Sequence, residues 1–150
     1  MKSFVDTSGR TWSVAIGVPA VRRLRDEMNF DVLSLLDDQS KLEIIAADPM
    51  IAIDLVTCII KPQLDAAGVA VDDFLNALGG EQLESATSCL LQAIVDFFPG
   101  PRGELLRKAL QRSQKFIQDQ DQQIKQKIQS GEVEQAIDEA LAAASTAGKS

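Results

Sequence analysis

The feature of this sequence that most constrains its fold is residues 49–67, a segment that is apolar on most sides when it is drawn as a helix. A narrow polar strip runs along it at spacings of three to four residues: Asp54, Thr57, Lys61 and Asp65. A helix with so little polar surface must be surrounded by other parts of the chain. We therefore expect it to be the central helix of a mainly α fold. Asp48 and Pro49 mark its start, and Pro62 is expected to kink or end it after Lys61.

The chain begins with the pattern of a β-hairpin. Residues 4–5 and 11–16 flank turn-forming residues 6–9, and apolar side chains alternate along the second strand. A two-stranded hairpin is only marginally stable alone, so its apolar face must pack on the helices, with Trp12 as the anchor. Short helices are expected next at residues 19–28, 31–36 and 41–46, and a second long helix at residues 81–98.

The second half of the chain changes from apolar to polar helix after Pro99-Gly100-Pro101. Residues 102–129 favour a helix, but eight Gln stand among residues 111–129, and the apolar side chains form only a thin seam. The seam consists of Leu106, Leu110, Ile117, Ile124 and Ile128, with Phe116 beside it. We therefore divide the chain into a hairpin and helical core, residues 1–100, and a helical arm with a C-terminal amphipathic helix, residues 101–150.

The charge of the chain is negative and unevenly distributed. Lys and Arg number 15 against 22 Asp and Glu, a net charge of -7. Residues 31–100 hold two basic and twelve acidic side chains, whereas residues 101–150 hold eight and seven. A core this acidic repels phosphate, so we expect no nucleic acid partner.

Targeting and redox features indicate a cytoplasmic protein. The N-terminus lacks a secretory apolar segment, and the longest apolar stretch, near residues 50–60, is interrupted by Asp54 and too short to span a bilayer. Cys58 and Cys89 stand singly in apolar runs and are expected to be free thiols in a reducing compartment. We expect no membrane partner.

The sequence offers no motif for catalysis, metal binding or a cofactor. It has no His, the side chain most used for acid and base catalysis near neutral pH and a common metal ligand. Adjacent carboxylates such as Asp37 and Asp38 do not face each other across a site, and neither a calcium loop nor a glycine-rich phosphate loop is present. We therefore expect no catalytic residue, no metal ligand and no cofactor. The enzymatic alternative would need a cleft that gathers Asp54, Asp65 and Asp96.

The polar arm is the candidate for binding a partner. A thin apolar seam on a Gln-rich helix suits docking against one partner helix, and packing on the protein's own body is the alternative. The residues expected to bind are Phe116, Ile117, Ile124, Ile128, Val133, Ile137 and Leu141. Binding would be a non-covalent masking of apolar helix surface. A homo-oligomer formed by pairing with a second copy of the chain is a further option.

Three patterns resemble small proteins encoded near the tape measure protein in tailed phages and prophages. They are the opening FVDTSGRTWSVAI at residues 4–16, the helix start DP at 48–49 and the run VDFFP at 95–99. The chain is thus similar to the tail assembly chaperones over about residues 2–110, and the Gln-rich arm lies outside this similarity. The resemblance implies a non-enzymatic role in the bacterial host cytoplasm, which is to keep the tape measure protein, or another helical tail protein, soluble until tail tube subunits assemble around it. A structural tail or virion component held permanently in a multimer is the alternative.

Overall fold

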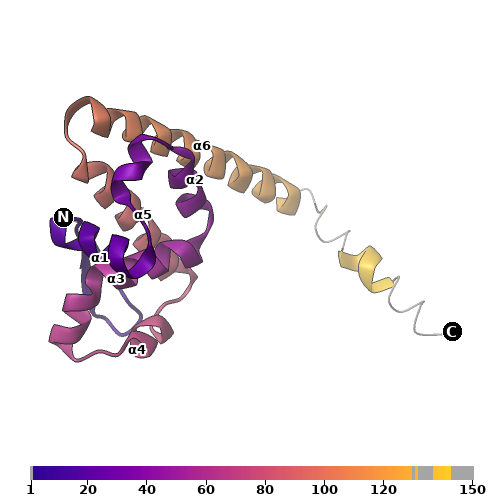
Figure 1. Ribbon diagram of the computed structural model, residues 1–150. Helices are drawn as coiled ribbons and strands as arrows, with labels where there is room; N and C mark the ends of the chain where they lie inside the picture. Colours follow the sequence, from indigo (N-terminus) through magenta and orange to yellow (C-terminus); the bar gives the residue numbers. More distant parts are fainter. Residues whose placement is uncertain (1, 130, 132–136, 143–150) are drawn as a thin grey trace. The chain divides into compact units, whose positions relative to one another are not determined.

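The computed structural model describes residues 2–129, 131 and 137–142, except for the side chain of Ile117 (Figure 1). The elements are, in chain order, β1 (Lys2–Val5), β2 (Thr11–Val14), α1 (Val18–Met28), the 3-10 helix η1 (Val32–Leu36), α2 (Ser40–Ala47), α3 (Pro49–Ala67), α4 (Val71–Asn76), α5 (Gly80–Phe97) and α6 (Gly100–Gln129). Helices dominate, which confirms the predicted mainly α fold with an N-terminal hairpin. Contacts divide the chain into Met1–Ser113 and Gln114–Ser150, which we call the core unit and the arm unit.

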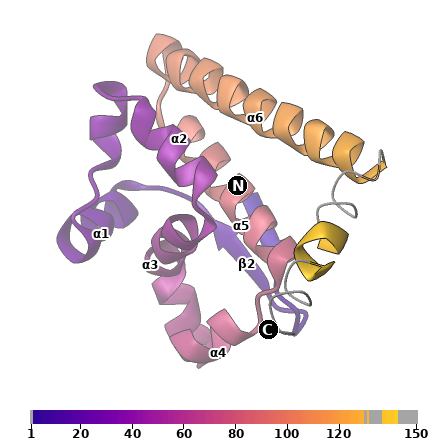
Figure 2. The ribbon, with the colours of Figure 1, turned by 90° about the vertical axis from the view of Figure 1, so that its right-hand side faces the viewer.

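The hairpin packs on the two long helices of the core unit. β1 and β2 pair antiparallel, with Phe4 opposite Trp12. Both side chains are buried, and the Trp12 ring meets Phe74 of α4 edge-on at 5.5 Å between centroids. β1 contacts α5, and β2 contacts both α3 and α5 (Figure 2). The predicted hairpin and its anchoring by Trp12 are therefore confirmed.

A buried carboxylate closes the hairpin turn. Asp6 Oδ1 accepts hydrogen bonds from the backbone N–H groups of Ser8 and Arg10, each at 2.9 Å, and Oδ2 accepts one from Trp12 Nε1 at 3.0 Å. Burial opposes the charged form of Asp6, but these hydrogen bonds and the Arg10 guanidinium outweigh it and lower the pKa of the carboxyl. The ionised form of Asp6 therefore stabilises the turn.

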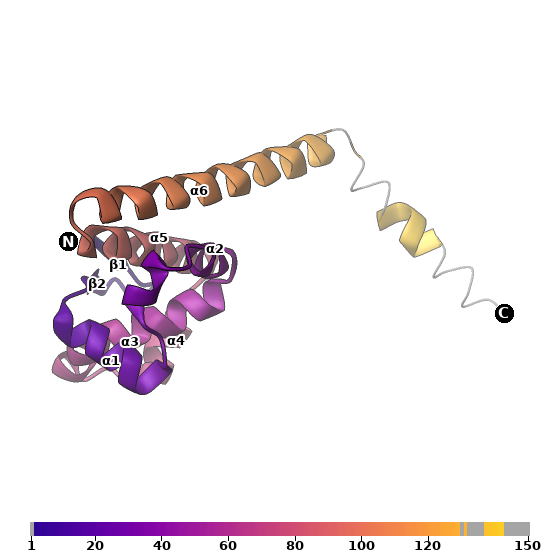
Figure 3. The same cartoon turned by 45° about the horizontal axis from the view of Figure 1, so that its top comes forward.

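α3 is the central helix, as its pattern predicted. Its buried side chains are Ala52, Ile53, Leu55, Val56, Cys58, Ile59, Ile60 and Leu64. The helices α1, α2, α4 and α5 all contact it, and α2 also contacts α5 (Figure 3). Asp48 caps the first turn, because its Oδ1 accepts a hydrogen bond from the Met50 N–H at 3.0 Å. The predicted short helices are confirmed as α1, η1 and α2, and the second long helix as α5.

Pro62 was expected to kink or end α3, and the second of these expectations is wrong, because a side chain of another helix replaces the missing hydrogen-bond donor. Proline has no N–H, which leaves the Cys58 carbonyl, four residues earlier, without its helical partner. Arg23 of α1 takes over this role: its Nε donates to Cys58 O at 3.4 Å and its Nη2 donates to Ile59 O at 3.0 Å. The helix therefore continues past Pro62 to Ala67.

The first turns of α6 belong to the core unit. Leu106 and Leu110 are 0% and 2% exposed and are members of the hydrophobic core. Gly103 permits a close approach here, because a Cβ at this position would lie 2.2 Å from the backbone oxygen of Phe98. Because the helix is mostly polar in composition, we predicted that these turns belong to the arm. Their apolar side chains are instead part of the core. The division of the chain thus falls at Ser113 rather than near residue 100.

Candidate partner-binding surface

The arm unit exposes large apolar side chains on a polar helix. In the part of α6 that follows Ser113, Phe116 is 63% exposed, Ile124 53% and Ile128 56%. The residues between them, apart from Ile117, are Gln, Lys and Asp. Single exposed apolar residues are common on protein surfaces, but three large ones on one short polar stretch are typical of a helix that docks on a partner. We call Phe116, Ile124 and Ile128 the arm seam.

Ile124 and Ile128 form the densest part of the arm seam. They stand four residues apart in α6, so they lie on the same side of the helix, about one turn from each other. Gln122 and Gln126 are also four residues apart and fall on the opposite side, since successive residues turn by about 100°. This stretch of α6 therefore has an apolar side that a partner helix can contact and a polar side that suits water.

The remaining predicted contact residues fall into two groups. Ile137 and Leu141 are helical, stand four residues apart, and are 53% and 63% exposed. The side chain of Ile117 and the whole of Val133 lie outside the described residues. Binding by any of these residues stays a prediction.

Two residues of the predicted seam face the protein itself. Leu106 and Leu110 were included in the apolar seam, but they pack in the core unit and are therefore not exposed to a partner. Only the exposed residues of the arm unit therefore remain candidates for contact with a partner.

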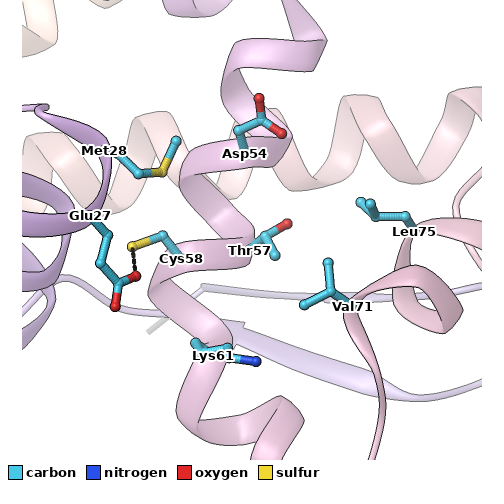
Figure 4. A pocket seen from close by; sticks show the side chains of 8 residues that line it. All are labelled: Glu27, Met28, Asp54, Thr57, Cys58, Lys61, Val71 and Leu75. Atoms are coloured by element: carbon cyan, nitrogen blue, oxygen red, sulfur yellow. Dashed lines mark hydrogen bonds between the residues drawn. The ribbon is translucent and has the colours of Figure 1, made fainter.

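The core unit carries a groove of about 300 Å³ between α1, α3 and α4 (Figure 4). It is lined by Glu27, Met28, Asp54, Thr57, Cys58, Lys61, Val71 and Leu75. The polar strip predicted for α3 supplies three of these residues, so the sequence identified one wall of the groove. It did not identify the other walls, because no local sequence pattern shows that α1 and α4 pack against α3.

The thiol in this groove is a hydrogen-bond donor. Cys58 Sγ donates to Glu27 Oε2 at 3.4 Å (Figure 4). Burial of the thiol, together with the nearby Glu27 carboxylate, raises the pKa of Cys58 to about 11. Cys58 therefore remains protonated near neutral pH, which is the opposite of what a nucleophilic cysteine requires. Cys58 and Cys89 are both free thiols, as predicted.

The carboxylates that an enzymatic site would need are not brought together. Asp54 lines the groove, whereas Asp65 Oδ1 lies 3.4 Å from Lys61 Nζ. Asp96 lines a different cavity of about 150 Å³, and its Oδ1 lies 3.9 Å from Arg107 Nη2. These three residues therefore do not form the cleft that the enzymatic alternative requires.

In the described part of the chain, no three or more His, Cys, Asp or Glu side chains gather in a way that could hold a metal ion. None of the described helices combines the length and the apolar character needed to cross a bilayer.

Comparison of the chain with protein-family models, with curated proteins and with solved structures gives no match.

Proposed function

We propose that this protein is a non-enzymatic binding protein that masks apolar helical surface on a partner. The observation that carries the proposal is the arm seam, in which three large apolar side chains are 53–63% exposed on the polar stretch of α6 that follows Ser113. Contact with an amphipathic helix would remove these side chains from water, and the favourable free energy would come mainly from the hydrophobic effect. No bond is made or broken in this mechanism.

The expected strength of the contact suits a reversible carrier. Complete burial of one large apolar side chain stabilises a contact by about 1.5–3 kcal/mol, so covering three that are 53–63% exposed contributes roughly 2.5–5 kcal/mol. This reaches at most the lower end of the roughly 4–15 kcal/mol that association of two molecules costs in lost freedom of motion. One arm seam alone therefore binds weakly. Stable masking therefore needs further contacts with the client, or several molecules of this protein bound along one long client. Each molecule can then be released from the client separately.

The client that we propose is the tape measure protein of a tailed phage, with the role of a tail assembly chaperone in the host cytoplasm. The proposal is supported by the resemblance of residues 4–16, 48–49 and 95–99 to that family. The acidic core unit adds support, because a carrier of an aggregation-prone helical client must itself remain soluble, and residues 31–100 hold twelve acidic and two basic side chains.

Co-expression with the tape measure protein tests this function. The pair Ile124→Asp with Ile128→Asp places two charges in the arm seam, where a client helix would have to desolvate them, and it should abolish co-purification. The matched control is Gln122→Asp with Gln126→Asp, which adds the same charge at the same spacing on the opposite side of the helix. The control should bind as the wild type does.

Two results would contradict the proposal. If both double variants retain the client, or both lose it equally, the arm seam is not the contact surface. If the protein is a constant component of purified phage particles, it is a structural tail protein rather than a chaperone, since a chaperone is released before the particle is complete.

A further inference from the structure

The groove on the core unit has a net negative charge that the described residues do not neutralise. The Asp54 carboxylate has no hydrogen bond or ion pair with any described residue, and the Glu27 carboxylate has only the Cys58 thiol. The one cation in the lining, Lys61, lies 3.4 Å from Asp65. Two carboxylates from different helices therefore line this groove without an ion pair to a described residue, and the Arg23 guanidinium nearby donates to the Cys58 and Ile59 carbonyls.

The wall of the groove that α4 supplies is apolar and partly exposed to solvent. Val71 and Leu75 of α4 point toward the groove beside Asp54 and Thr57 (Figure 4). Leu75 is 38% exposed, and Met50, four residues before Asp54 on α3, is 62% exposed. Apolar surface thus continues beyond the groove along α3 and α4.

We propose that this groove docks a basic amphipathic helix of a partner protein. A Lys or Arg side chain of that helix would lay its aliphatic stem along Val71 and Leu75 and direct its charged end toward Glu27 and Asp54. Long basic side chains combine these two properties, an apolar stem and a cationic end, and so match a groove that is apolar on one wall and acidic on the other. The space of about 300 Å³ admits side chains rather than a folded domain.

Charge decides the class of partner. The core unit, residues 1–113, carries a net charge of -5, from eleven basic and sixteen acidic side chains. This field attracts a basic segment and repels phosphates and acidic helices. The groove is a second surface, distinct in its residues from the arm seam, and this inference goes beyond the proposed function because it holds whichever client the arm seam takes.

A peptide titration tests the groove directly. The probe is a fluorescent amphipathic peptide of leucine and lysine, about 18 residues or five helical turns long, and the control peptide has glutamate in place of lysine. The protein is the full chain carrying Ile124→Asp and Ile128→Asp, so that the arm seam cannot capture the peptide. We expect fluorescence anisotropy to show binding of the lysine peptide and at least about tenfold weaker binding of the glutamate peptide.

Variants of the groove then locate the contact. Glu27→Gln with Asp54→Asn should weaken binding by about five- to tenfold, because two partly exposed ion pairs are lost. Leu75→Lys, which places a cation in the apolar wall, should weaken it by more than about tenfold. The matched control, Asp72→Asn with Asp73→Asn, removes the same charge outside the groove lining and should stay within about twofold of the parent. Circular dichroism of each variant verifies the fold.

The outcomes separate the groove from its alternatives. Failure of the lysine peptide to bind overturns the proposal, as does equal weakening by the groove pair and the control pair, which would show diffuse attraction to the acidic surface. Because the arm seam is already inactivated, loss of peptide binding here leaves the proposed function of the arm untouched, and the reverse also holds.

Discussion

Two pairs of apolar side chains on α6 have the same local pattern and opposite environments. Leu106 and Leu110 stand four residues apart and are buried in the core unit, whereas Ile124 and Ile128, also four apart, are more than half exposed in the arm unit. The spacing establishes in both cases that the pair lies on one side of a helix. It does not say what covers that side. Ile124 and Ile128 therefore form the same kind of apolar helix side that Leu106 and Leu110 bury in the core, but no described residue covers it.

The largest expected effect is a difference in stability between the two pairs. Leu110→Ala removes buried methyl groups and leaves a cavity, so it should lower the free energy of unfolding of the core unit by about 2–5 kcal/mol. Ile124→Ala should change it by no more than about 0.5 kcal/mol, because the side chain is exposed. Urea unfolding monitored by the fluorescence of Trp12, which is buried in the core, measures both. Equal losses would show that Ile124 is part of the core.

A second prediction concerns how the core tolerates Pro62. Arg23→Met removes the donors to the Cys58 and Ile59 carbonyls and should lower the free energy of unfolding by about 1–3 kcal/mol. In a Pro62→Ala background the cost should be smaller, because the N–H of Ala at this position can bond to the Cys58 carbonyl. A double-mutant cycle measures this coupling. If the cost of Arg23→Met is the same with and without Pro62, the guanidinium does not compensate for the proline.

The smallest effect is the pH dependence of the hairpin turn. The pKa of Asp6 is lowered below its ordinary value of 3.8, so the stability it contributes is present above that value and is lost as the pH falls through the lowered pKa. Asp6→Asn should therefore give a flatter loss of stability in acid than the wild type shows. Thermal unfolding at a series of acidic pH values measures this. A variant with the same acid dependence as the wild type would show that Asp6 does not stay charged in the turn.

Much of the fold could be predicted because local patterns and tertiary contacts agree. The alternation that includes Trp12 and Val14 identified the hairpin, and the near-complete apolar cover of residues 49–67 identified the central helix. The sequence could not decide between a kink and an end at Pro62, because the compensating donor, Arg23, comes from another helix. The end of the core was placed too early because Leu106 and Leu110 are buried within a helix of mostly polar composition.

The two candidate surfaces differ in how far the sequence could identify them. The arm seam is a property of one helix, so spacing was enough to name Ile124 and Ile128, with Phe116 beside them. The groove needs Glu27 from α1, the polar strip of α3 and Val71 from α4, and no local pattern brings these three elements together. A surface built from several helices, such as this groove, can be identified only once the tertiary structure is known.

Photo-crosslinking from single positions of α6 tests whether the arm seam contacts the client. Benzoylphenylalanine would be incorporated at position 124 or 128, or at the opposite positions 122 or 126, and the protein irradiated in cells that also make the tape measure protein. We expect crosslinks to the partner from positions 124 and 128 and few from 122 and 126. Crosslinks of equal yield from both sides of the helix, or none from position 124, would contradict it.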